Sequence, residues 1–338
     1  MEEVIVMSKR LRRPLERGAV AAALVLACIT AVVEPLGSLV PSIGAPALAL
    51  ILGMAIRARY APDAAGRRVI GFASKTLLQC AIVLLGGTFG LGQVVRIGRS
   101  SLPLMLGTLA IALAAAWVIG RGLRVESTLT TLVGVGTAIC GASAIGAVSG
   151  VVAATESEIA YAISTIFVFN VVAVLLYPTL GHVLSLSQHT FGLWAGTAVN
   201  DTSSVVAAAY AYGHTAGGVA VVTKLARTTM IIPVVLALAL ARARRVGAAR
   251  TRPLWRVLPV FLFWFLVASA LNTAGAIDPR TTAMLGHAAS IVIAIALGAI
   301  GLSTQFAAIR HLGWRPLALG AALWAVVGLT GLLLQGVV

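Results

Sequence analysis

Charged residues are scarce in this 338-residue chain, in which Asp, Glu, Lys and Arg together make up 10% of the residues. A soluble globular domain typically carries about 25%. Hydrophobic residues make up 59% of the chain, and its mean hydropathy is +1.01. Apolar stretches long enough to cross a hydrocarbon core of roughly 30 Å recur along nearly all of it, and they lack the short alternating pattern of barrel strands. The composition therefore excludes a soluble domain and predicts an all-α, polytopic membrane protein.

Cysteine and the common catalytic motifs are also nearly absent. Cys28, Cys80 and Cys140 lie in apolar runs without CxxC spacing, and we expect Cys28 and Cys80 to be small buried side chains. The sequence lacks GxxxxGK[ST], HExxH and GxSxG, and Asp201 is its one acidic residue well inside an expected span. These absences disfavour an ATP-driven pump and an intramembrane protease. We expect no enzyme activity, no metal site and no cofactor.

Basic residues are present in excess, and their placement indicates membrane topology. The formal net charge of +15 comes mostly from Arg in short loops between apolar runs, which is the positive-inside pattern and not that of a nucleic-acid-binding surface. With a cytoplasmic N-terminus and about eleven spans, the basic loops all fall on the cytoplasmic side. These loops are Arg57–Arg68, Arg121–Arg124, Arg242–Arg256 and Arg310–Arg315. Residues 1–17 form a basic cytoplasmic arm, and residues 18–338 a single transmembrane domain.

The apolar runs predict 10 or 11 transmembrane helices, with short turns between them. The expected spans cover residues 18–33, 44–56, 69–89, 102–120, 128–153 and 159–177, two spans within 191–233, and residues 257–271, 283–302 and 316–335. The sixth of these is expected to stop at Pro178, and the acidic turn with Glu156 and Glu158 to lie outside.

Two of these segments are unusual for lipid-facing helices. GVGTAICGASAIGAVSG, within 128–153, has Gly or Ser every two to four residues, which favours either close helix packing or a broken helix. The segment 190–212 carries Asn200, Asp201 and three following hydroxyl residues in an apolar run, and the next span carries Lys224 and Arg227. Intramembrane polar residues normally face a cavity or a partner, so a polar site inside the membrane is expected.

Internal similarities suggest a repeat. GLGQVVRIGRSSLPLMLG, from Gly90 to Gly107, resembles GLSTQFAAIRHLGWRPLALG, from Gly301 to Gly320, and both are expected at turns on opposite sides. Inverted repeats are typical of secondary transporters, which bind substrate near the midplane. GTAICGASA (136–144) also resembles GTAVNDTSS (196–204), yet eleven crossings make these two stretches run in the same direction. This second similarity is either only compositional, or one segment is re-entrant.

The polar groups of these segments are sufficient to bind a small anion. A broken helix exposes backbone N–H groups at a positive half-helix N-terminus. Candidate substrate-binding residues are Gly136, Thr137, Cys140, Gly141, Ser143, Asn200, Thr202, Ser203, Ser204, Lys224 and Arg227. Asp201 is a candidate carrier of a proton or a sodium ion. The alternative is that Asp201 forms a fixed structural ion pair with Lys224 or Arg227. Asn170 either lines the cavity with it or makes an interhelical hydrogen bond.

Several motifs together resemble the sulfate exporter family, a group of conserved hypothetical bacterial inner-membrane proteins. They are GVGTAICGASAI, FVFNVVAVLLYP, FGLWAGTAVNDTSSVVAA, VTKLARTTMIIPVV and GLSTQFAAIRHLGWRPLALG. The resemblance implies two inverted repeats with crossing interrupted helices, similar to bile-acid and cation/proton antiporter transporters, and secondary transport of sulfate or a related sulfur oxyanion or sulfonate. Many relatives carry His where this chain has Asn200, so a proton relay at that position is not implied.

A secondary transporter of a small anion, working by alternating access and coupled to protons or sodium, is therefore the leading hypothesis. The alternative within transport is a sodium/proton antiporter that uses Asp201. An intramembrane enzyme and a structural or receptor protein are lesser hypotheses. The small-residue motifs permit a homodimer, but they serve packing within one subunit equally well.

Overall fold

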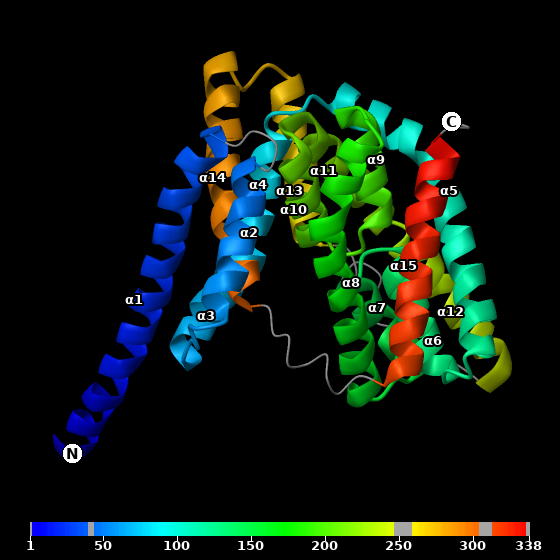
Figure 1. The fold of residues 1–338 in the computed structure, drawn as a ribbon, viewed down its shortest axis with the longest axis horizontal. Helices are drawn as coiled ribbons and strands as arrows, with labels where there is room; N and C mark the ends of the chain where they lie inside the picture. The colour runs from blue at the N-terminus through cyan, green and yellow to red at the C-terminus, as the bar shows by residue number, and fades with distance from the viewer. Residues whose placement is uncertain (1, 40–43, 247–258, 304–312, 336–338) are drawn as a thin grey trace. The chain divides into compact units, whose positions relative to one another are not determined.

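The chain is described here from a computed structural model, which covers residues 2–39, 44–246, 259–303 and 313–335 (Figure 1). Within these residues the chain is helical and contains no β-strand, so the predicted all-α polytopic class is confirmed. Seven helical segments in this part of the chain are long and apolar enough to cross a membrane, and shorter apolar helices accompany them. The residues form two compact units: Met1–Phe89 with Trp264–Thr304, and Gly90–Phe263 with Gln305–Val338.

The first unit combines long and short helices that pack through small residues. Its helices are α1 (Glu2–Leu39), α2 (Gly44–Arg57), α3 (Ala64–Phe72), the π-helix η1 (Ala73–Leu77), α4 (Leu78–Gly86), most of α13 (Val260–Thr273) and α14 (Pro279–Ser303). α14 lies against α2, where a Cβ placed on Gly53 would be 2.4 Å from the Gly298 carbonyl oxygen. The glycines therefore allow the two backbones to touch.

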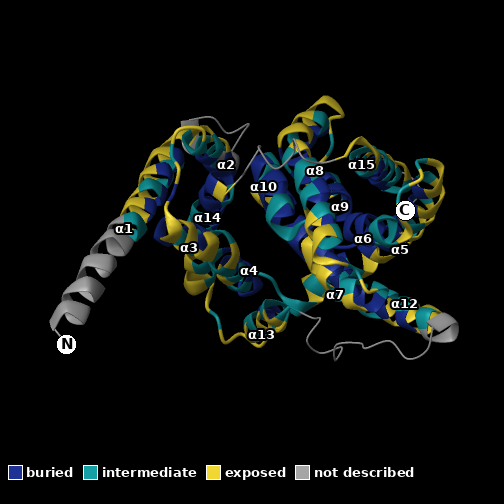
Figure 2. Cartoon of the chain, turned by 90° about the horizontal axis from the view of Figure 1, so that it is seen from below, coloured by how far each residue is buried: buried dark blue, intermediate teal, exposed yellow. Residues whose placement is uncertain are grey.

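The second unit contains the segments that the sequence marks as unusual. Its helices are α5 (Leu91–Gly122), α6 (Ser127–Ala138), α7 (Ala142–Val152), α8 (Glu156–Val183), α9 (Gln188–Ala198), α10 (Thr202–Tyr212), α11 (His214–Thr228), α12 (Ile231–Val246) and α15 (Trp314–Gln335). α5, α8, α15 and the pair α11–α12 are long enough to span a membrane. Figure 2 shows that α6, α9 and α10 are mainly buried, so the short helices form the centre of this unit.

Several helix boundaries differ from the sequence-based expectation; α1, for example, runs from Glu2 to Leu39, where a span over residues 18–33 was expected. α8 continues through Pro178 to Val183, because the backbone group that proline frees can be satisfied by neighbours inside a bundle. α5 begins at Leu91 and includes Pro103, so most of Gly90–Gly107 is helix and not the turn expected of the first repeat copy. Most of the second copy's turn lies outside the described residues.

Candidate functional site

The segment α9–α10 enters and leaves the second unit at the same end, as a re-entrant helical hairpin. The ring of Tyr212, at the end of α10, stacks on Phe191 in α9 with the centroids 3.9 Å apart. Gln188, at the start of α9, accepts a hydrogen bond at 3.0 Å from the backbone N–H of Thr215, which follows α10. The expected crossing of the membrane by this segment is therefore wrong, and the re-entrant alternative holds.

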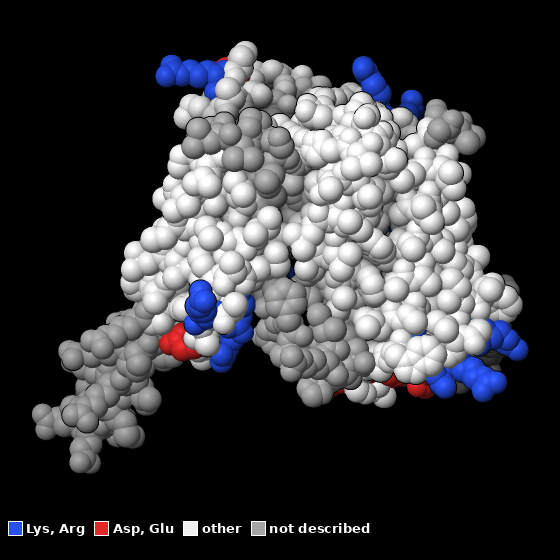
Figure 3. Space-filling model, viewed as in Figure 1, with Lys and Arg blue, Asp and Glu red and all other residues white. Residues whose placement is uncertain are grey.

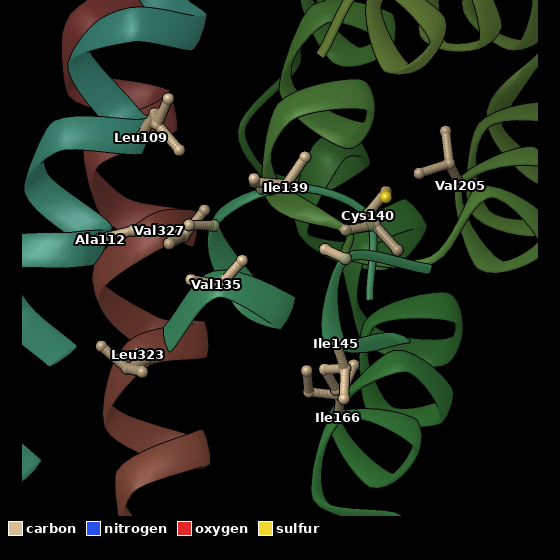
Figure 4. Packing of buried hydrophobic residues seen from close by; sticks show 14 of the residues in the cluster. Leu109, Ala112, Val135, Ile139, Cys140, Ile145, Ile166, Val205, Leu323 and Val327 are labelled. Atoms are coloured by element: carbon tan, nitrogen blue, oxygen red, sulfur yellow. The ribbon is translucent and has the colours of Figure 1, made fainter. Parts of the chain in front are cut away.

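The segment α6–α7 is a second hairpin. A Cβ on Gly136, near the end of α6, would lie 3.0 Å from Ile145 of α7. Figure 4 shows Val135 and Ile145 on the same side of the turn that contains Ile139 and Cys140. Both helices therefore run from the turn toward the same end of the unit, as Figure 1 also shows.

The two hairpins are attached to opposite ends of α8. α7 ends at Val152, just before α8, and α9 begins at Gln188, just after it. α8 has 28 residues and is about 42 Å long at 1.5 Å per residue. The hairpins therefore enter from opposite sides. GTAICGASA and GTAVNDTSS accordingly run in opposite directions, and the expectation that they run the same way is wrong.

This topology also moves the acidic turn. Glu156 and Glu158 begin α8, where Thr155 forms a capping box with Glu158. The turn lies at the end of the unit where α5 ends and α6 begins (Figure 1), which is the end that carries Arg121 and Arg124. The sequence count placed these turns on opposite sides, because it treated the first hairpin as a crossing. Each hairpin replaces one expected crossing of the membrane, so the chain crosses two times fewer than expected. Because this number is even, the basic loops before and after the hairpins remain on the same side as each other, as predicted.

The tips of the two hairpins meet. The first tip is Ile139, Cys140 and Gly141, with Gly141 at φ +68° and ψ −128°, a conformation that glycine adopts readily and residues with a Cβ do not. The second tip is Val199, Asn200 and Asp201, in extended conformation at its first and last residues. A Cβ on Gly141 would lie 3.6 Å from the Cβ of Asp201. Non-helical backbone from both hairpins is therefore in contact at one place.

Lys224 joins the two tips. Its Nζ donates to the carbonyl oxygens of Ile139 at 2.7 Å and Val199 at 2.9 Å, the C-terminal caps of α6 and α9. The side chain is fully buried. A cation at two helix C-termini offsets their partial negative charges and satisfies carbonyls that the helices leave unpaired. Within the described residues Lys224 makes hydrogen bonds to these carbonyls and no ion pair with Asp201, so the fixed Asp201–Lys224 pair is not formed.

Arg227 lies one turn further along α11. Its Nε donates to the carbonyl oxygen of Ala138 at 2.8 Å, again at the end of α6. Its Nη1 and Nη2 atoms are buried without a hydrogen-bond partner among the described residues, as are Asn200 Oδ1 and Thr223 Oγ1. Buried polar atoms are normally paired, so each of these atoms has capacity to bind water or a polar group of a ligand.

Asn170 and Asp201 organise the second tip. Asn170 Oδ1, on α8, accepts hydrogen bonds at 3.3 Å from the backbone N–H groups of Asn200 and Asp201. Asp201 is the N-cap of α10: its carboxylate accepts from the backbone N–H of Ser203 at 3.0 Å and also from the Ser203 hydroxyl. Asp201 is half-buried, and its charge lies at the positive end of α10.

The remaining predicted site residues divide by exposure. Gly136, Thr137, Cys140 and Gly141 are buried, and Gly136 packs against Ile166 of α8. Ser143, in the first turn of α7, is exposed, and Thr202, Ser203 and Ser204 are half-buried in the first turn of α10. The accessible polar groups are therefore those at the N-termini of α7 and α10, and Lys224 and Arg227 lie behind them in the interior.

Two glycines that position Lys224 were missed from the sequence. Gly192 and Gly196 form a GxxxG pair on α9, and a Cβ on either would come within 2.9 Å of α11. Their small size brings α11 against α9, in parallel, so that Lys224 reaches Val199. The spacing in FGLWAGTA was the available signal.

The conserved hypothetical protein 698 family model matches residues 21–320 of this chain. The chain belongs to this family. A UPF0324 membrane protein of Streptococcus agalactiae serotype V is 39% identical over 310 residues, which covers 89% of this chain and 92% of that protein. A UPF0324 membrane protein of Streptococcus mutans serotype c is 40% identical over 313 residues, again covering 89% and 92%. No solved structure matches. The resemblance to a family of conserved hypothetical membrane proteins is confirmed, and this UPF0324 chain is a multi-pass membrane protein.

Proposed function

We propose that this protein is a secondary-active transporter of a small anion, such as sulfate, a related sulfur oxyanion or a sulfonate. It resides in the bacterial inner membrane with a cytoplasmic N-terminus, and it works by alternating access with a proton or sodium ion carried at Asp201. The observation that carries the proposal is the contact between the two re-entrant tips at Gly141 and Asp201. Non-helical backbone at membrane depth occurs where it is enclosed by protein or lines a polar cavity, which is how secondary transporters build substrate sites.

The charges around the tips support an anion at the start of α7. The C-terminal ends of α6 and α9 face Lys224, and the N-terminal end of α10 faces Asp201. The N-terminal end of α7 is capped by Gly141, which offers no side-chain acceptor. The backbone N–H groups of Ala142 and Ser143, in the first turn of α7, and the exposed Ser143 hydroxyl are donors for an oxyanion. In this proposal Lys224 holds the tips in place and Arg227 supplies positive potential from behind.

Asp201 then sets the coupling. An anion at the start of α7 lies next to this carboxylate, since the Cβ positions at Gly141 and Asp201 are 3.6 Å apart. Two like charges about 4 Å apart repel by about 4 kcal/mol at an effective dielectric constant of 20. Such a repulsion weakens binding by nearly a thousandfold. The anion therefore binds well only when Asp201 carries a proton or a sodium ion.

Ligand-induced thermal stabilisation of purified full-length protein tests this coupling. Sulfate, sulfite, thiosulfate, sulfonates, bicarbonate and carboxylates are screened against pH and sodium concentration. A ligand at a hundredfold excess over its Kd stabilises the folded state by about 2.7 kcal/mol. We expect one anion to stabilise the wild type more at low pH or high sodium, and Asp201→Asn to bind it without this dependence. Asp278→Asn, at the exposed N-cap of α14, is the matched control.

Flux in proteoliposomes then separates transport from binding alone. Saturable uptake of the same anion, driven by a proton or sodium gradient in wild type and uncoupled in Asp201→Asn, is the expected result. Stabilisation by sodium or pH alone, lost in Asp201→Asn and without any anion effect, would instead support a sodium/proton antiporter. An anion effect whose pH and sodium dependence survives in Asp201→Asn would refute the assigned role of Asp201.

A further inference from the structure

A groove on the second unit lies apart from the hairpin tips, between α5, α6 and α12. Its volume is about 290 Å³, roughly twice the ~150 Å³ cavity that accommodates benzene in another protein. Its wall includes Leu113 and Trp117 of α5, Val135 of α6, and Val234 and Leu238 of α12. The wall is mainly apolar, so an aliphatic chain is the ligand that its chemistry suits.

One end of the groove is basic. Four residues beyond Trp117 on α5 is Arg121, and four residues beyond Leu238 on α12 is Arg242, so each arginine extends a lining face by one helical turn. Ser127, the first residue of α6, lines this same end, because α5 and α6 run antiparallel, with Gly120 against Thr130. Figure 3 shows Lys and Arg side chains gathered at the lower right, where Figure 1 places the ends of α5 and α12.

The charge at this end selects an anionic headgroup. Arg121 and Arg242 extend the lining faces, and Arg124 and Glu126 follow in the turn between α5 and α6, whereas Glu156 and Glu158 at this end belong to the start of α8, which does not line the groove. The first N–H groups of α6 have no side-chain cap, which adds donors beside the arginines. Trp117 is 66% exposed, as expected of a tryptophan at the boundary between acyl chains and headgroups.

We propose that this groove binds one anionic phospholipid of the surrounding bilayer. An acyl chain lies between α5, α6 and α12, and the phosphate is held by Arg121, Arg242 and the start of α6. α6 is one arm of a hairpin, and α12 packs on α7, its other arm. The bound lipid therefore supports the first hairpin from outside.

Lipid titration of detergent-purified full-length protein tests this site. Dioleoyl phosphatidylglycerol and dioleoyl phosphatidylcholine, which differ only in headgroup, are compared by thermal shift, and retained lipids are counted by native mass spectrometry. We expect one phosphatidylglycerol to be retained and to raise Tm more than phosphatidylcholine does. Replacing both arginines in Arg121→Gln/Arg242→Gln should weaken phosphatidylglycerol binding by about 30-fold, from the usual contribution of a basic residue at an anionic surface.

Matched variants keep the test specific. Arg96→Gln/Arg99→Gln removes two exposed charges from the other end of α5 and should leave phosphatidylglycerol binding unchanged. Ala237→Trp fills the groove from an exposed position and should abolish retention of the lipid, whereas Leu236→Trp, also exposed but outside the wall, should not. Equal effects of both lipids, equal losses in the two arginine pairs, or retention of lipid in Ala237→Trp would each overturn the proposal.

Discussion

Replacing Lys224 with Met tests whether the hairpin tips depend on this side chain. Methionine keeps a long apolar stem and removes the ammonium group that donates to Ile139 and Val199. Both carbonyl oxygens then lose a charge-assisted partner in the interior, and each unpaired buried group costs about 1–3 kcal/mol. The variant no longer has to bury an ammonium charge, and the desolvation free energy that this saves offsets part of the cost. A net loss of about 3 kcal/mol is expected, which lowers Tm by roughly 6–12 °C for a unit of about 200 residues.

Thermal denaturation of the purified protein measures this loss, with Lys75→Met as the control. Lys75 is an exposed lysine within the span Ala64–Gly86, so its replacement removes the same charge without freeing a buried carbonyl. Lys224→Arg keeps the hydrogen-bond donors and the positive charge, so its Tm should lie between those of Lys224→Met and Lys75→Met. If Lys224→Met is as stable as Lys75→Met, the hydrogen bonds from Lys224 do not stabilise the hairpin tips, and this reasoning is wrong.

Three further substitutions probe the elements around the tips. Gly141→Ala forces a residue with a Cβ to φ +68° and should cost about 1–3 kcal/mol in thermal unfolding, whereas Gly146→Ala, in open space on the same hairpin, should be near neutral. Gly196→Val introduces a side chain that clashes with Ala220 and Thr223 of α11. It should lower the free energy of unfolding by about 1–3 kcal/mol and reduce flux. Gly150→Val is the control, because a Cβ at Gly150 meets nothing within 4 Å. Asn170→Leu removes the acceptor for two tip N–H groups, so hydrogen exchange at Asn200 and Asp201 should rise, whereas Asn170→Asp keeps an acceptor and should change it less.

Much of the fold could be predicted from the sequence because apolar length and Arg placement report directly on spans. The starts of α2 at Gly44 and of α15 at Trp314, for example, lie within two residues of the expected spans. The breaks were also visible, since glycines in 136–146 and the polar run 200–204 cannot belong to ordinary lipid-facing helices. The similarity of GTAICG to GTAVND even aligns Ile139 with Val199, the two residues whose carbonyls share Lys224.

The direction of these segments could not be predicted in the same way. A re-entrant hairpin of two 11-residue helices and a broken crossing helix have the same apolar length, and two hairpins together leave the charge pattern of the basic loops unchanged. The partner of Lys224 was also hidden, because Asp201 is the obvious charge in the sequence and a carbonyl at a helix end has no sequence signature. That partner depends on how closely α11 approaches α9 at Gly196.

The shared amine of Lys224 has a consequence for leakage across the membrane. The hairpin α6–α7 enters from one side of the second unit and the hairpin α9–α10 from the other. The buried ammonium group of Lys224 donates hydrogen bonds to the tips of both. Withdrawal of one tip leaves the ammonium with its other carbonyl, but withdrawal of both leaves a full charge in the interior without any partner, at a cost of several kcal/mol. We therefore expect the two sides to open in turn, so that a continuous pore through the second unit is the least populated arrangement.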